Sequence, residues 1–99
     1  FDAYVGYACT IIAWTITADV AGDIEFDLFL DDFATWSGPG SGSSIVAAAP
    51  PLLSGAIKDQ DTTLSGWTTA IPADSVISGE ITGTPATLTR ATLTLTVEV

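Results

Sequence analysis

The end of the chain alternates between polar and apolar residues, and this period of two constrains the fold more than any other feature. One set of alternate positions carries Arg90, Thr92, Thr94, Thr96 and Glu98, and the other carries Ala91, Leu93, Leu95, Val97 and Val99. Side chains of a strand point in turn to its two faces, so the pattern predicts a half-buried strand at about 87–98. Threonine on the open face keeps the β propensity high without adding charge.

A second alternating segment lies nearer the N-terminus, at 23–31 (DIEFDLFLD). Acidic residues and Phe29 occupy one face, and Ile24, Phe26, Leu28 and Leu30 occupy the other. Two further strands are predicted at about 4–9 and 11–18, where β-branched and aromatic residues dominate. Asp19, Ala21 and Gly22 are turn-forming signals, so we expect residues 18–23 to close a hairpin between 11–18 and 23–31.

The remaining segments are shorter. Residues 33–44 are rich in Gly and Ser and predict a long loop, 45–57 an edge strand or an extended crossing segment, and 58–61 (KDQD) a polar turn. Turns at 72–74 and 83–85 bound a strand at about 75–82. Seven or eight short strands without a capped helix predict one all-β domain over 1–99, an antiparallel, jelly-roll-like β-sandwich.

Charge and hydropathy exclude several classes of partner. The net charge is −10, and Lys58 and Arg90 are the only bases, so we expect neither nucleic-acid binding nor attraction to an anionic membrane. No apolar run approaches the roughly 18 residues of a membrane span. With 47% hydrophobic residues, the chain is apolar for its size, and part of this excess is expected to cover a subunit interface.

The residues needed for common catalytic mechanisms are missing. The chain has no histidine, and its single cysteine, Cys9, is predicted to be a buried structural thiol. The glycine-rich segment 38–42 does not continue into the Gly-Lys-Ser/Thr of a phosphate-binding loop. We therefore expect no enzymatic activity and no cofactor.

The acidic face of 23–31 is the candidate metal site, formed by Asp23, Glu25, Asp27 and Asp31. Calcium prefers six to eight oxygen ligands, so a neighbouring strand or loop would have to supply more oxygens. A solvated strand face without metal is the simpler interpretation, and a structural calcium site is the alternative.

Aromatic residues supply the candidate contact site. Trp14 and Trp67 lie within strand patterns and are expected in the core. Phe33 and Trp36 lie at the start of the long loop, where an exposed ring can stack on a sugar or on a partner protein. The alternative for Trp36 is that it folds over the edge of the sheet.

Several short segments, in this order, resemble a β-rich module from the C-terminal ends of bacteriophage tail-fibre and related virion proteins. The matching pieces cover nearly the whole chain: Tyr7-Ala8-Cys9-Thr10-Ile11, Trp14, Ala18-Asp19, Gly22, Leu64-Ser65-Gly66-Trp67, Ile71 and Thr89-Arg90-Ala91-Thr92-Leu93-Thr94-Leu95.

The resemblance implies a non-enzymatic virion module at the tip of a tail fibre or similar appendage, at the end of a longer virion protein. Such a module contacts the host surface, including its glycans, or caps the fibre, and it assembles with other virion proteins and as a homotrimer. Two alternatives stay open. One is a capsid-decoration or head-fibre protein, and the other is a calcium-supported carbohydrate-binding module.

Overall fold

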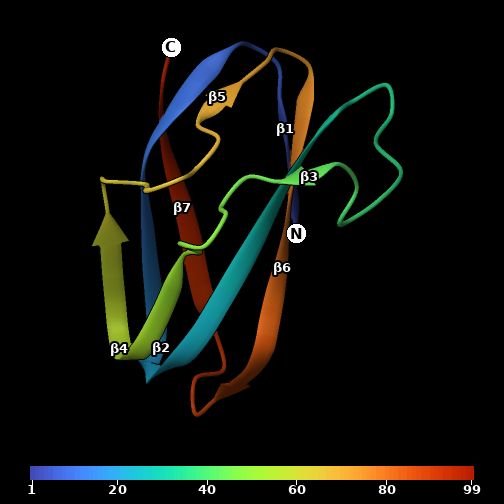
Figure 1. The fold of residues 1–99 in the computed structure, drawn as a ribbon. Helices are drawn as coiled ribbons and strands as arrows, with labels where there is room; N and C mark the ends of the chain where they lie inside the picture. Colours follow the sequence, from blue (N-terminus) through green and yellow to red (C-terminus); the bar gives the residue numbers. More distant parts are fainter.

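The protein folds into one antiparallel sheet of seven strands (Figure 1). The computed structural model describes the backbone of residues 1–99 and every side chain except that of Ala86. The strands are β1 (Asp2–Val5), β2 (Cys9–Asp32), β3 (Ser43–Ser44), β4 (Leu52–Asp61), β5 (Ala70–Ile71), β6 (Ser75–Ala86) and β7 (Ala91–Glu98). The predicted all-β class is confirmed. In the part of the chain that is described, no helix is long and apolar enough to cross a membrane.

Strand β2 is the central strand of the sheet, because every other strand except β1 pairs with it. Glu25 pairs with Leu52 of β4 and with Thr82 of β6, which places β4 and β6 on opposite edges of β2. Towards the N-terminus of β2, Trp14 pairs with Asp61 of β4 and with Leu95 of β7. One edge of β2 is therefore covered by β4, and the other by β6 and then β7.

The chain turns back between 11–18 and 23–31 (Figure 1), but the predicted hairpin at 18–23 is wrong, because in the described chain these two segments do not pair with each other. Residues 11–18 and 23–31 belong to the same strand, and each half pairs with a different partner, β7 or β6. The turn-forming residues instead coincide with shifts in the β2–β4 register between Thr17 and Gly22 and between Gly22 and Ile24. Such irregularities bend a strand and increase its twist.

The carboxylate of Asp19 holds the bend in β2 against the connection between β6 and β7. It accepts hydrogen bonds from the backbone N–H of Thr89 (3.1 Å) and of Arg90 (3.0 Å) and from the Thr89 hydroxyl (2.5 Å). The backbone N–H of Asp19 in turn donates to the carbonyl oxygen of Arg90 at 3.0 Å. The bend in β2 and the connection between its partners β6 and β7 thus meet at Asp19.

The core contains side chains from both halves of β2 and from β4 and β6. The alternation predicted for 23–31 is confirmed, because Ile24, Phe26 and Leu28 are buried and the acidic face is not. The core also contains Trp14, Trp67 and the free thiol of Cys9, as predicted. In β7 the half-buried Ala91, Leu93 and Leu95 alternate with exposed threonines.

Three other boundaries differ from the sequence predictions. Residues 58–61 are not a turn but the end of β4, which pairs with Trp14–Thr17. Strand β6 continues past the predicted turn at 83–85 as far as Ala86, so the chain changes direction at 87–90 and β7 begins at Ala91. A short strand, β5, adds to the start of β2 at Cys9 and Thr10. Pairing with β2 overrides the local turn signals at the first two of these positions.

Replacing Asp19 with alanine is expected to destabilise the fold in a pH-dependent way. Hydrogen bonds from Thr89 and Arg90 lower the pKa of Asp19 from 3.8 to about 2. A carboxyl whose pKa is depressed in the folded state contributes stability above its unfolded pKa, and this is lost as the pH falls through the folded pKa. Urea unfolding should therefore show a difference between wild type and Asp19→Ala that is full at pH 7 and shrinks between about pH 4 and pH 2.

The matched control is Asp59→Ala, because the Asp59 carboxylate accepts a hydrogen bond only from the neighbouring Gln60 N–H among the described contacts. An Asp59→Ala variant that lost as much stability as Asp19→Ala would contradict the special role of the bend.

Candidate functional site

The acidic residues of β2 form a row along one face, as the sequence predicts, and each carboxylate accepts a hydrogen bond from a neutral group. Asp23 accepts from the backbone N–H of Gly55 (2.6 Å), Glu25 from the Thr82 hydroxyl (2.7 Å) and Asp27 from the Ser44 hydroxyl (2.7 Å). These donors come from β4, β6 and β3. The row therefore helps to join β2 to its neighbours on both edges.

Asp31, the last member of the row, anchors the long loop. It accepts hydrogen bonds from the hydroxyls of Thr35 (2.6 Å) and Ser41 and from the backbone N–H of Asp32 (2.9 Å). The bond from Ser41, and then that from Thr35, lower the pKa of Asp31, although desolvation acts in the opposite direction. Two positions of the loop, Thr35 and Ser41, are thus attached to one carboxylate.

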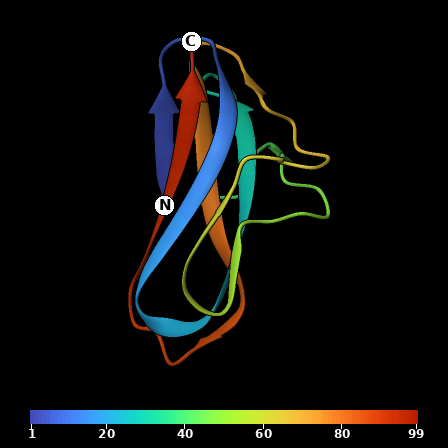
Figure 2. The same ribbon diagram turned by 90° about the vertical axis from the view of Figure 1, so that its left-hand side faces the viewer.

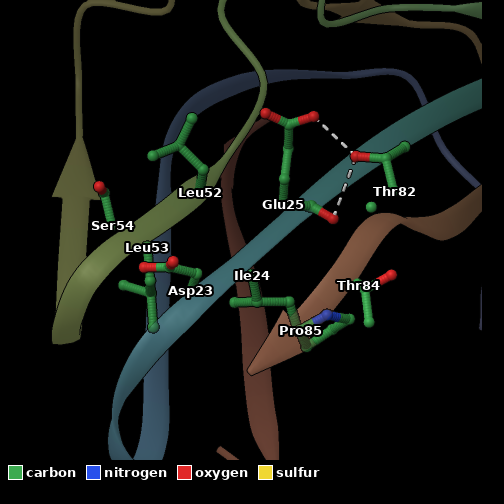
Figure 3. Close-up of a pocket in the computed structure, with 10 residues that line it drawn as sticks. Asp23, Ile24, Glu25, Leu52, Leu53, Ser54, Thr82, Thr84 and Pro85 are labelled. Carbon is green, nitrogen blue, oxygen red and sulfur yellow. Dashed lines mark hydrogen bonds between the residues drawn. The ribbon is translucent and has the colours of Figure 1, made fainter. Parts of the chain in front are cut away.

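A shallow hollow of about 330 Å³ lies beside the first two members of the row. Figure 3 shows Asp23 and Glu25 on β2, with Leu52 and Ser54 of β4 on one side and Thr82 and Pro85 of β6 on the other. Among the described residues, no group of three or more Asp, Glu, Cys or His side chains is placed to hold a metal ion. The members of the row stand at alternate positions of one strand and are therefore spread along it.

Trp36, one of the two aromatic candidates, is half-buried against the sheet. Its indole N–H donates to the hydroxyl of Ser78 at 3.0 Å, and Ser78 is completely buried in β6. Of the two alternatives for Trp36, the structure shows the ring folded over the sheet.

The loop returns to β2 at Gly42. A Cβ atom at this position would lie 2.0 Å from the carbonyl oxygen of Leu30, and the φ angle of Gly42 is +89°.

Phe33, the other candidate, is 62% exposed and forms a pair with Tyr4, which is 59% exposed. The ring centroids lie 5.7 Å apart at an interplanar angle of 82°, the edge-to-face arrangement that aromatic pairs favour. Tyr4 belongs to β1 and Phe33 follows β2, and β6 lies between these two strands. The pair therefore spans the end of three neighbouring strands.

Asp74 forms hydrogen bonds with both residues of the pair. Its carbonyl oxygen accepts a hydrogen bond from the backbone N–H of Phe33 at 2.8 Å, and its carboxylate accepts one from the Tyr4 hydroxyl. Asp74 itself has a φ of +57°, a left-handed conformation that is uncommon outside glycine. The hydrogen bond to Asp74, with smaller effects of burial and of the carboxylate charge, raises the pKa of Tyr4.

Sequence reasoning identified Phe33 but missed Tyr4 and Asp74. Tyr4 stands in a predicted strand and Asp74 in a predicted turn, and neither position differs from an ordinary strand or turn residue. Their role depends on β1 and β2 both pairing with β6, a contact between segments about 70 residues apart in the chain. The sequence contains no signal for it.

A groove is lined by residues of β1, β6 and β7, and β1 and β7 run in the same direction in Figure 2. Its volume is about 290 Å³, and the residues that line it are all apolar: Phe1, Ala3, Val5, Ile77, Leu93, Leu95 and Val97. In the described chain, β7 pairs only with β2, so its second edge has no strand partner.

Comparisons with protein-family models, with curated proteins and with solved structures found no match to this chain.

Replacing Trp36 with phenylalanine is expected to destabilise the protein by about 1–3 kcal/mol, because the buried Ser78 hydroxyl loses its hydrogen-bond donor. Urea unfolding measures the loss. Adding Ser78→Ala to Trp36→Phe should recover part of it, since removing both partners leaves no unpaired polar group. A double variant that is less stable than Trp36→Phe would show that packing, and not this hydrogen bond, explains the loss.

Proposed function

We propose that this chain is a non-enzymatic structural module of a bacteriophage virion, at the tip of a tail fibre or similar appendage, where it contacts the host surface or caps the fibre. The exposed Tyr4–Phe33 pair carries the proposal. Large apolar rings are usually buried, and two adjacent rings held in the open suit contact with a ligand or partner. The ordered resemblance of the short segments to fibre-tip modules supports the same function.

The proposal includes a two-layered arrangement of the strands, as in a jelly-roll-like β-sandwich. The bend in β2 supports it, because β7 pairs with residues before the bend and β6 with residues after it. Side chains from both halves of β2, including Ile16 and Leu28, belong to one buried cluster. In such an arrangement the loops gather at the ends of the layers, and Phe33 directly follows the end of β2.

The proposed ligand is a glycan of the host surface. A sugar ring presents C–H groups on one face and hydroxyls at its rim, so it can stack on an aromatic ring while its hydroxyls bond to a nearby carboxylate. Tyr4, Phe33 and Asp74 offer both kinds of group within one patch. A free-standing carbohydrate-binding module is the second candidate, and it is favoured by the same patch.

Location within the particle separates these candidates. Antibodies against the domain, labelled with gold, should mark the appendage tips of purified virions in electron microscopy. Label spread over the capsid would favour a decoration protein, and a complete absence of label on virions would contradict the proposal. Binding to a glycan array without virion association, measured with and without added calcium, would favour the carbohydrate-binding module.

Replacing Phe33 with alanine is expected to weaken binding of the isolated domain to host envelopes by about 2 kcal/mol, which is roughly thirtyfold in Kd. The ring is 62% exposed, so its loss should leave the fold intact. Fluorescence titration of labelled domain against envelope fragments measures the change.

Ile57→Ala is the matched control, because Ile57 is 48% exposed and lies on β4, away from the aromatic pair. Equal loss of binding in the two variants would show that general surface hydrophobicity, and not the Tyr4–Phe33 pair, makes the contact.

A further inference from the structure

We propose that two copies of this chain associate by antiparallel pairing of their β7 strands about a two-fold axis at Thr94. The inference goes beyond the proposed function, which names no contact between copies of the chain. It also differs from the trimer that the family resemblance implies, so the two can be distinguished by mass.

The free edge of β7 is the first reason. The strand is eight residues long, pairs with β2 on one edge only and contains no proline. Natural edge strands are usually protected by lysine, proline, a bulge or a covering segment. The register of β7 against β2 shifts near the C-terminal end of β7, where β7 pairs with Ile11 and Ala13. The rest of the strand pairs regularly.

The apolar groove beside this edge is the second reason. Leu93, Leu95 and Val97 line it from β7, and Ala3 and Val5 line it from β1. Val97 is 39% exposed, and Leu93 and Leu95 are only half-buried although they belong to the inner face of the strand. A second β7 strand added to this edge would place its own leucines and valine over the groove.

Charge complementarity favours a second copy of the chain as the partner and one particular register of the two β7 strands. In an antiparallel pair with Thr94 opposite its own copy, residues at equal distances on either side of Thr94 oppose each other. Arg90 then lies opposite Glu98 of the second copy, and this happens twice because the interface is two-fold. Moving the axis to Leu93 or Leu95 would place Arg90 opposite threonine or beyond the strand end.

The rest of this face fits the same register. Thr92 opposes Thr96 of the second copy, and Thr94 opposes Thr94, so the outer face carries threonine pairs, which stabilise sheets. On the inner face Leu93 opposes Leu95, and Ala91 opposes Val97. All paired residues keep their side of the sheet, as an axis perpendicular to the sheet requires.

The charge of −10 on each copy opposes association, but its main concentration is not at the seam. From Ala91 to Val97 the strand has no charged residue. The acidic row lies on the half of β2 beyond the bend, which pairs with β6, whereas β7 pairs with residues 10–18. At physiological salt, charges separated by more than about 8 Å are largely screened.

Cysteine cross-linking tests the register directly. Directly opposed residues have Cα atoms about 4.5–5.5 Å apart, within the range of about 4.4–6.8 Å that a disulfide spans. Thr94→Cys should therefore form a covalent dimer under mild oxidation. Thr92→Cys alone should not, but it should cross-link when mixed with Thr96→Cys. The native Cys9 is buried and does not interfere.

Exchanging the two charges tests whether Arg90 pairs with Glu98 of the second copy. Sedimentation equilibrium at physiological salt measures the mass of each variant and gives the dissociation constant of the dimer. Arg90→Glu should weaken the dimer roughly tenfold, because it places like charges opposite each other twice. Combining Arg90→Glu with Glu98→Arg should restore the dissociation constant to within about threefold of wild type. Lys58→Glu makes the same change in net charge on β4 and should have little effect.

A dimeric mass, with cross-linking at Thr94 and rescue by the exchange, supports the inference. A monomer at 100 µM, a trimer, cross-linking of Thr92→Cys equal to that of Thr94→Cys, or a failure of the exchange to rescue would overturn it. None of these results affects the location of the module on the virion, so failure of this inference and failure of the proposed function are separable.

Discussion

The contact between the Asp19 carboxylate and the backbone of Thr89 and Arg90 is the point on which the rest of the sheet depends. Strand β2 has to change direction there, and the strands on its other edge have to change with it. One ionised side chain satisfies the backbone N–H groups that this break leaves unpaired.

Once the bend is set, the two kinds of surface on the molecule are separated. The acidic row lies on the half of β2 that pairs with β6, and its carboxylates are bonded to hydroxyl and amide donors from β3, β4 and β6. The threonine-bearing β7 pairs with the other half. The acidic row and the uncharged stretch of β7 therefore lie beside different halves of β2.

The aromatic patch shows the same dependence on long-range pairing. Tyr4 and Phe33 meet because β1 and β2 both end beside the start of β6, where Asp74 bonds to both. Trp36 was the equal candidate by sequence, but its indole N–H bonds to the buried Ser78. Phe33 and Trp36 are only three positions apart, but Phe33 is exposed and Trp36 packs on the sheet.

The sequence by itself determined the all-β class, the inward and outward faces of 23–31 and of the last strand, and the burial of Trp14, Trp67 and Cys9. These features follow from the period of two, which can be read from a few neighbouring residues, and from the tendency of apolar side chains to be buried. Only the tertiary structure decided that 18–23 is a bend and not a hairpin, that 58–61 is strand and not turn, and that Tyr4 joins Phe33. Turn propensities are small energies, and the backbone hydrogen bonds and apolar burial gained by continuous pairing along β2 outweigh them.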